Sequence, residues 1–233
     1  MTKFVFSCEH GGYEIPEDYQ SYFTGQDEVL KSHRGWDRGA LEIAQYISRR
    51  ADSKLISNSV SRLLIEFNRT LGHKELFSEF SQKMPEDIQK IMIEDYYLPY
   101  KSQLERKIEQ HLHHNHQVIH LSFHSFKPIL NGEIRKTEIG ILFDPASKLE
   151  QEFAEVWKAS IDEKMDSWRV KFNYPYKGTD DGLTTYFRGK YEKNYAGLEL
   201  EINTKLFDLY PLHQISNWVF PPLTFHKKYK IRN

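Results

Sequence analysis

The stretch VIHLSFH at residues 118–124 decides the fold that we expect, because it is an apolar run that stops at a histidine. Successive side chains of a strand alternate between its two faces, so one face of this run is wholly apolar. The other face carries His120 and, at the exit of the strand, His124. Such a run predicts a buried strand that delivers its last side chain to the open edge of a sheet, where α/β proteins build their sites.

Two further runs have the same form. FVFSCEH at residues 4–10 ends in His10, and GLELE at residues 197–201 ends in Glu201, with Glu199 on the same face. Burying carboxylates on a central strand costs free energy unless a metal ion, an arginine or hydrogen bonds compensate. The sequence lacks the G-x-S-x-G motif that would indicate a serine hydrolase. Together these runs suggest a hydrolytic metal site.

The rest of the chain alternates strand-like and helix-like segments, which predicts an α/β fold. Helical spacing is clearest after Trp36 and in the segment 85–116, where Pro99 should kink or divide the helix. No linker, repeat or low-complexity block interrupts the pattern, so we expect a single domain over residues 1–233. The expected strands are 3–8, 54–58, 62–67, 117–123, 137–143, 168–172 and 197–202.

Composition excludes several classes of function. A formal net charge of -1 over 233 residues gives no general attraction to nucleic acid or to an anionic membrane. The single cysteine, Cys8, excludes an internal disulfide and a thiolate zinc site, which leaves histidines and carboxylates as metal ligands. No apolar stretch reaches about 18 residues, and MTKFVFSCEH does not have the form of a signal peptide. We therefore expect a cytoplasmic protein with a small-molecule partner.

Seven blocks in the same order resemble the N-formylglutamate amidohydrolase family, over residues 3 to about 205. The resemblance implies a three-layer α/β/α sandwich with a mixed, mostly parallel central sheet, phosphorylase/hydrolase-like and related to the zinc carboxypeptidases. It also implies a zinc site at strand ends and hydrolysis of the amide of an N-acyl amino acid. The blocks are SCEHGGYEIP at 7–16, HRGWDRGA at 33–40, SRLLIEFNR at 61–69, SFHSF at 122–126, EIGILFD at 138–144, NYPYKGTDDG at 173–182 and GLELEIN at 197–203.

The resemblance implies that His10 and His124 are two ligands of a zinc ion. Related deacylases place a glutamate three positions after the first histidine, but Tyr13 stands there in this chain. The preferred third ligand is Asp37, which lies in a block that matches the family itself, and Glu14 and Glu9 are the alternatives. Two imidazoles and one carboxylate leave a coordination position open for water, as a catalytic zinc requires.

The resemblance also gives a role to Glu201 as the general base, with Glu199 as the alternative on the same face. A base takes a proton from the attacking water and passes it to the leaving nitrogen, so it must lie within about 3 Å of that water. The structural alternative is that both glutamates form a layer of ion pairs with Arg62 and Arg69.

The EFNR block resembles the asparagine–arginine pair that holds a substrate carboxylate in related deacylases, which makes Asn68 and Arg69 the substrate-binding candidates. Arginine suits this role because its planar fork donates two parallel hydrogen bonds. Arg62 is a second candidate for substrate binding. Arg135 would meet a second carboxylate or stabilise the developing oxyanion. The structural alternative is that Asn68 and Arg69 only satisfy backbone groups.

Other features favour a structural interpretation. The structural alternative for Asp37 is that it caps the helix that follows it, and the histidines of HLHHNH at residues 111–116 are typical of a solvated helix end. The leading hypothesis is a zinc amidohydrolase that removes an acyl group, by analogy formyl, from an acidic amino acid such as glutamate. The alternatives are a related enzyme acting on a peptide, a cell-wall amide or another acyl amino acid, and a binding module that has lost the metal site.

Overall fold

A six-stranded mixed sheet forms the centre of the computed structural model, which describes residues 1–224. The strand order is β2-β1-β3-β8-β6-β7; the first four run parallel, and β6 is antiparallel to β8 and parallel to β7. A hairpin of β4 (Ile129–Leu130) and β5 (Glu133–Ile134) follows the third strand. The sheet strands are β1 (Thr2–Cys8), β2 (Leu55–Ser57), β3 (Gln117–Phe126), β6 (Ile139–Leu142), β7 (Val170–Phe172) and β8 (Tyr195–Asn203).

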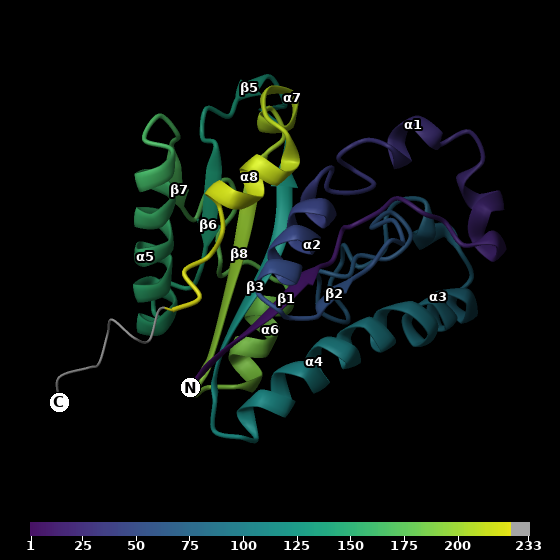
Figure 1. Ribbon diagram of the computed structural model, residues 1–233. Helices are drawn as coiled ribbons and strands as arrows, with labels where there is room; N and C mark the ends of the chain where they lie inside the picture. Colours follow the sequence, from purple (N-terminus) through teal and green to yellow (C-terminus); the bar gives the residue numbers. More distant parts are fainter. Residues whose placement is uncertain (225–233) are drawn as a thin grey trace.

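Helices cover both faces of the sheet (Figure 1), and this confirms the expected three-layer α/β/α fold. One face packs against α2 (Ala40–Arg50), α5 (Lys148–Lys164) and α8 (Leu212–Trp218), and the other against α4 (Leu98–Leu112) and α6 (Leu183–Lys190). The remaining helical segments are α1 (Asp27–Leu30), α3 (Glu86–Met92), α7 (Leu206–Leu209), the 3₁₀ turns Glu17–Phe23 and Ser81–Lys83, and the π turn Ile93–Tyr97.

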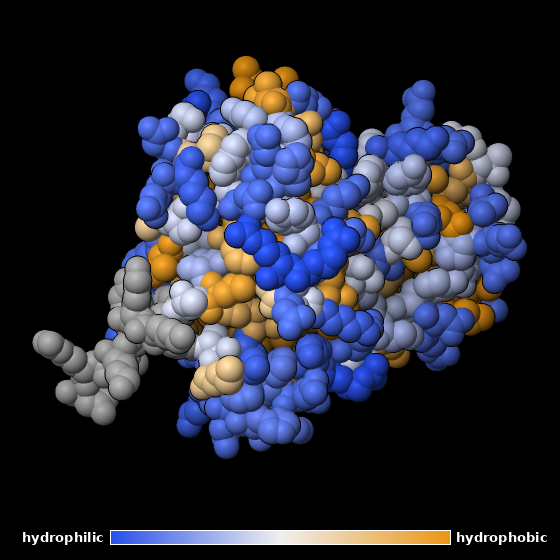
Figure 2. Space-filling view, in the orientation of Figure 1, coloured by the Kyte–Doolittle hydropathy of each residue, from blue (hydrophilic) through white to orange (hydrophobic). Residues whose placement is uncertain are grey.

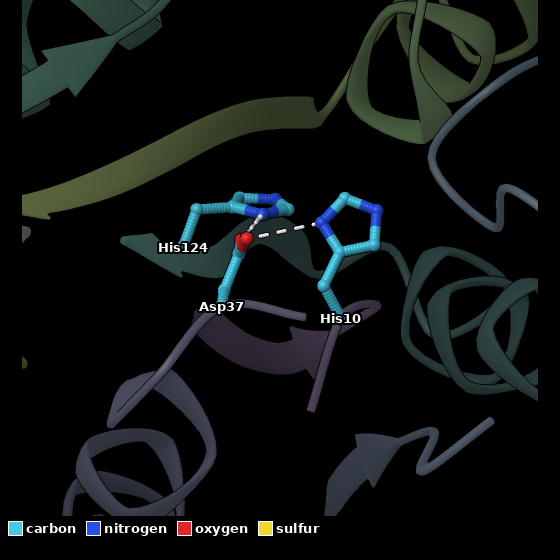
Figure 3. Close-up of side chains that lie close together, drawn as sticks. All are labelled: His10, Asp37 and His124. Carbon is cyan, nitrogen blue, oxygen red and sulfur yellow. Dashed lines mark hydrogen bonds and ion pairs between the residues drawn. The ribbon is translucent and has the colours of Figure 1, made fainter. Parts of the chain in front are cut away.

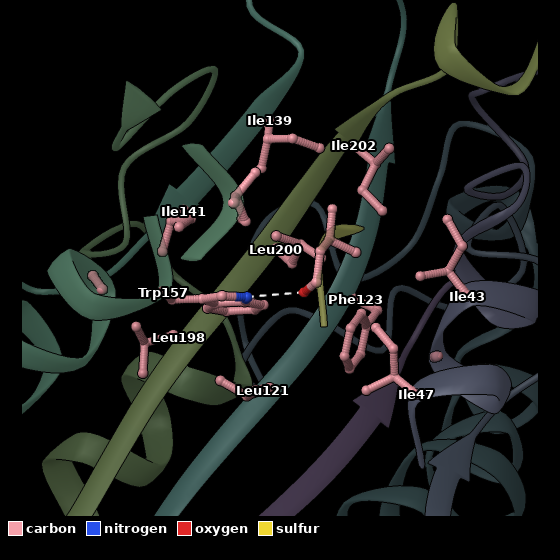
Figure 4. Close-up of a cluster of buried hydrophobic side chains, with 14 of the residues drawn as sticks. Ile43, Ile47, Leu121, Phe123, Ile139, Ile141, Trp157, Leu198, Leu200 and Ile202 are labelled. Carbon is pink, nitrogen blue, oxygen red and sulfur yellow. Dashed lines mark hydrogen bonds between the residues drawn. The ribbon is translucent and has the colours of Figure 1, made fainter. Parts of the chain in front are cut away.

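The core on the first face is made by alternate residues of the central strands (Figure 4). Leu198 and Leu200 of β8 are fully buried against Ile43 of α2 and Trp157 of α5. The indole of Trp157 donates a hydrogen bond of 2.9 Å to the carbonyl oxygen of Val219. Burial of each large apolar side chain contributes about 1.5–3 kcal/mol. The alternation leaves the other face of the same strands free to carry polar residues.

Hydrophilic residues cover much of the surface seen in the orientation of Figure 1, and apolar residues show in smaller areas between them (Figure 2). In the described part of the chain, no helix combines the length and apolar character needed to cross a membrane.

The prediction of a strand at 62–67 is wrong. This segment forms turns, in which the backbone nitrogen of Leu64 donates to the carbonyl oxygen of Ser61 at 2.9 Å. Leu64, Ile65 and Phe67 are nevertheless buried in the second core cluster, against α4 and α6. The short apolar run therefore predicted burial correctly, but its pattern did not distinguish a strand from a packed loop.

The long helical segment is divided, as its proline suggested. A π turn at Ile93–Tyr97 lies between α3 and α4, and the backbone stays helical through both junctions. Pro99, in the first turn of α4, has no N–H to donate to the preceding turn. The helix expected after Trp36 begins only at Ala40, because Gly39 at its N-cap has a left-handed φ of 78°. Trp36 and Asp37 therefore lie in a loop that precedes α2.

Candidate metal centre

Three segments bring His10, Asp37 and His124 together. His10 follows β1, His124 lies near the carboxyl end of β3, and Asp37 lies in the loop before α2. The backbone nitrogen of Asp37 donates to the carbonyl oxygen of His10 at 3.0 Å, which ties the two loops together. In Figure 3 the Asp37 carboxylate lies between the two rings. Its Oδ2 is 3.2 Å from Nδ1 of His10 and 2.9 Å from Nδ1 of His124.

The donor atoms of these three buried residues fit a divalent cation. All three lie within 4.8 Å of one another. Ligands at 2.0–2.2 Å from a tetrahedral cation are separated by about 3.3–3.6 Å, slightly more than the two distances from Asp37 to the histidines. Two imidazoles and a carboxylate form a set that zinc and similar metals accept, and they leave the fourth position of a tetrahedron for another ligand.

The charges around the three residues also favour a cation. Asp37, Glu9 and Glu66 are buried carboxylates, and the guanidinium of Arg62 contacts two of them. Although burial opposes ionisation, the facing His10 and His124 and the nearby Arg62 hold the pKa of Asp37 well below its usual range. Buried negative charge is costly unless positive charge compensates for it. Although burial opposes charge on His124, its hydrogen bond to Asp37 and the nearby Glu199 raise its pKa to about 10, so a proton on this ring supplies part of that charge until a metal ion replaces it.

Glu201 lies beside this cluster on β8, where its Cα is paired with that of His124. It is buried, and its Oε2 makes no hydrogen bond within the described residues. Burial, reinforced by Asp37 and Glu199, raises the pKa of Glu201 to about 8, against the opposing effect of His124. A buried carboxylate oxygen without a donor costs about 1–3 kcal/mol, so this atom is suited to receive a hydrogen bond from a water molecule or a ligand.

A pocket of about 190 Å³ opens beside these side chains. The nine residues selected from the sequence all line it, so the structure brings the whole candidate set together. Polar and charged groups dominate its wall, which also includes Lys127, Tyr176 and Lys177. The nine are His10, Asp37, Arg62, Asn68, Arg69, His124, Arg135, Glu199 and Glu201.

The family model for N-formylglutamate amidohydrolase matches residues 2–207. The chain belongs to the N-formylglutamate amidohydrolase family. This family name denotes an amidohydrolase, a hydrolase that acts on a carbon–nitrogen bond. A search among curated proteins found no match.

Two solved structures have the same fold. A gene product of Agrobacterium tumefaciens is 24% identical with a TM-score of 0.80, and the match covers 93% of this chain and 87% of that one. The N-formylglutamate amidohydrolase from Ralstonia eutropha JMP134 is 18% identical with a TM-score of 0.66, over 92% of this chain and 91% of that one. The second structure places a named N-formylglutamate amidohydrolase on the same architecture as this family member.

The alternatives for the third ligand lie elsewhere. Glu14 is exposed and accepts a hydrogen bond of 2.6 Å from Ser59 Oγ, outside the pocket lining. Glu9 is fully buried, but it lies on the Nε2 side of the His124 ring, at 3.4 Å. The side chain of Asp37 does not cap α2, so the capping interpretation is wrong.

Arg62 is held by the protein's own carboxylates. Its Nε and Nη2 lie 2.7 and 2.6 Å from Oε2 of Glu66, and its Nη1 lies 3.5 Å from Oδ1 of Asp37. The ion pairs of Glu199 and Glu201 with arginines, which were the structural alternative, are not found among the described residues; Glu199 instead accepts a hydrogen bond of 2.8 Å from Thr184.

Asn68 and Arg69 fix the loop against the start of α6, as the structural alternative anticipated. Asn68 Oδ1 accepts from the backbone nitrogen of Leu183 at 2.8 Å, and Arg69 Nη1 donates to the carbonyl oxygens of Asn68 and Asp181. The buried Nε of Arg69 makes no hydrogen bond within the described residues, and the nearest carboxylate oxygen, on Glu75, is 3.7 Å away. Within the described residues only Nη1 of Arg69 is engaged, which leaves Nε and Nη2 for a ligand.

Arg135 approaches the pocket from the segment that follows the β4–β5 hairpin. Its guanidinium lies over the rings of Phe126 and Tyr176, at 5.8 and 5.6 Å from their centroids. Aromatic faces attract a cation without neutralising it, so Arg135 remains able to bind an anionic ligand.

Sequence reasoning gave no role to Glu66, although it stands inside the EFNR block. Its Oε1 contacts Nε2 of His10. The signal that was available is an acidic residue in a buried apolar segment, two positions before Asn68, because such a carboxylate needs a partner.

Proposed function

We propose that this protein is a metal-dependent amidohydrolase that cleaves the N-acyl amide, and specifically the N-formyl amide, of an acidic amino acid such as N-formyl-L-glutamate. The observation that carries the proposal is one pocket that contains the His10–Asp37–His124 cluster and the hydrogen-bond-free oxygen of Glu201. Membership of the family supports the reaction class.

The three clustered residues would hold one divalent cation, which we propose to be zinc. A bound cation of this kind supplies a Lewis acid that polarises the scissile carbonyl and acidifies a water molecule. His10 and His124 contribute neutral imidazoles, and Asp37 contributes the negative charge.

Glu201 acts as the general base. Its carboxylate accepts the proton of the attacking water and then returns that proton to the amine nitrogen as the carbon–nitrogen bond breaks, so formate and the free amino acid are produced. The pKa of about 8 belongs to the site without a cation. A positive charge beside Glu201 stabilises its ionised form, which is the form a base requires.

Arginines on two sides of the pocket bind the substrate carboxylates. Asn68 and the unused Nε of Arg69 hold one carboxylate, and Arg135 holds the other or stabilises the charge on the carbonyl oxygen. Arg62 is paired with Glu66. Its role in substrate binding is therefore indirect: it holds the loop that carries Asn68 and Arg69.

The test combines metal analysis with substituted enzymes. Protein purified without chelator should contain about one equivalent of divalent metal, and His10→Ala should lose it. Glu201→Gln should keep the metal while kcat falls by about 10²–10⁴-fold, since that is the usual contribution of a general base. Glu199→Gln is the matched control, because it removes a charge from the same face of β8, and its kcat should change much less.

The substrate class is tested with N-formyl-L-glutamate, N-formyl-L-glutamine, N-acetyl-L-glutamate and a short peptide. Preference for the first compound supports the proposal. Unchanged hydrolysis in both His10→Ala and Glu201→Gln would rule out the mechanism, and faster cleavage of the peptide would move the protein to a different substrate class.

A further inference from the structure

The ring nitrogen of His10 that points away from Asp37, Nε2, contacts the carboxylate of Glu66, which other hydrogen bonds hold in place. Nε2 of His10 contacts Oε1 of Glu66, which also accepts a hydrogen bond of 3.0 Å from the backbone nitrogen of Asn68. The other oxygen of Glu66 receives Nε and Nη2 of Arg62. Glu66 is 6% exposed, so its carboxylate has little freedom to turn away.

The ring nitrogen of His124 that points away from Asp37, Nε2, is linked through the hydroxyl of Ser122 to the carboxylate of Glu9. Nε2 of His124 lies 2.8 Å from Oγ of Ser122, and this hydroxyl donates to Oε2 of Glu9. Glu9 is completely buried and also accepts a hydrogen bond of 2.9 Å from the hydroxyl of Tyr100. Because the single proton of Ser122 is directed to Glu9, its oxygen is left to accept a proton from His124.

These contacts determine where a neutral imidazole carries its one proton. An ionised carboxylate only accepts hydrogen bonds, so Glu66 and the Ser122–Glu9 pair both place the proton on Nε2. The lone pair is then on Nδ1 of each ring. Both Nδ1 atoms face Oδ2 of Asp37, which cannot donate to them while it is ionised. Without a metal, a proton on Nδ1 can join each ring to Asp37. Once those protons leave, the three lone pairs that face one another favour a cation between them.

We propose that Glu66 and Glu9 are positioning residues that fix the Nε2-protonated tautomers of His10 and His124 and so prepare both Nδ1 atoms for a divalent metal. This inference rests on the metal site of the proposed function. The contact of Glu66 is direct whereas that of Glu9 passes through Ser122, so loss of Glu66 has the larger effect.

The test measures metal affinity rather than activity. Protein stripped of metal is titrated with zinc against a chelator of known affinity. Glu66→Gln keeps the size of the side chain and removes its charge, and zinc should bind about 10–100-fold more weakly. Glu138→Gln is the matched control: Glu138 is also buried and paired with a cation, Lys205, but lies outside the pocket, so zinc affinity should not change.

Ser122→Ala provides an independent variant that removes a single buried oxygen and should fold even if Glu66→Gln does not. It should weaken zinc binding by a smaller factor. Histidine ¹⁵N spectra of the zinc-loaded protein give a second readout, in which two rings should carry the proton on Nε2. Wild-type zinc affinity in both Glu66→Gln and Ser122→Ala, or Nδ1-protonated rings in the loaded protein, would overturn the proposal.

The two proposals fail in different ways. Weaker zinc binding in both variants, together with no hydrolysis of N-formyl-L-glutamate by the wild-type protein, would preserve the positioning role and reject the substrate. Wild-type protein that binds no divalent metal would reject both.

Discussion

At the residue scale, the positive charge of Arg62 partly compensates the negative charges of two buried carboxylates. Its guanidinium contacts Glu66 and approaches Asp37, and these two in turn contact His10. Although burial opposes charge on the guanidinium, the two carboxylates hold the pKa of Arg62 above its usual value. Removal of this one side chain would leave both carboxylates without their nearest permanent cation.

Arg62→Met should therefore lower the free energy of unfolding of the metal-free protein, because it leaves two buried carboxylates unpaired. The loss should stay below that of a fully buried pair, about 3–5 kcal/mol, because Arg62 itself is 27% exposed to solvent. Arg169→Met is the control, since Arg169 is 57% exposed and 3.7 Å from its partner Glu138. An exposed pair contributes about 0–1 kcal/mol. Urea unfolding measures both, and equal losses in the two variants would contradict the role given to Arg62.

A second prediction at this scale concerns substrate choice. Arg135→Met should raise KM for N-formyl-L-glutamate about 10-fold or more, because a charge-assisted hydrogen bond to a carboxylate is worth roughly 1.5–3 kcal/mol. N-formyl-L-glutamine is the matched compound, since it has the same shape and lacks the second charge. Steady-state kinetics with the two compounds decide the point: an equal rise in KM for both would assign Arg135 to another role.

At the scale of elements, the loop between His10 and α2 depends on Gly39. Its φ of 78° is unfavourable for any residue with a side chain. A Cβ at this position would lie 2.7 Å from the ring of Phe207. The loop that carries Asp37 therefore ends at a position where only glycine fits without strain.

Gly39→Ala should lower the free energy of unfolding by about 1–2 kcal/mol for the backbone and by a further 1–3 kcal/mol for the contact with Phe207. Gly25→Ala is the control, because Gly25 has a φ of 74° and no atom within 4 Å of an added Cβ. Only the backbone cost of about 1–2 kcal/mol applies there. Denaturant titrations that gave the same loss for both would show that Phe207 moves aside freely.

Sequence pattern predicted the strands that bear the site better than the loops that complete it. Alternation of apolar and polar residues placed His124 and Glu201 on the correct face of their strands, because a period of two leaves no other choice. The position of Asp37, the proposed third ligand, depended on the path of a loop, which has no period. The pattern did not identify Glu66 for the same reason: a carboxylate that contacts a metal-binding histidine needs no fixed spacing from it in the sequence.

At the scale of the whole molecule, binding of a cation should be visible in global stability. We propose that the chain is a single domain, and the metal-free protein should then unfold in one transition. Zinc at about 100 times its dissociation constant should add about 2.7 kcal/mol. His10→Ala should lose this gain. Calorimetry that resolved two transitions would contradict the single domain, and an equal gain in His10→Ala would place the zinc elsewhere.

The antiparallel direction of β6 has a consequence for how this family can vary. Because β6 starts at the edge of the sheet where β3 ends, the chain between them stays at that edge and need not cross a face of the sheet. The β4–β5 hairpin and Arg135 lie in this connection, apart from every proposed metal ligand. If Arg135 binds substrate as proposed, one short hairpin would influence selectivity without contributing a metal ligand. Replacing residues 129–134 by a tight turn should then change the ratio of kcat/KM for N-formyl-L-glutamate and N-formyl-L-glutamine, while zinc affinity measured against a chelator stays the same.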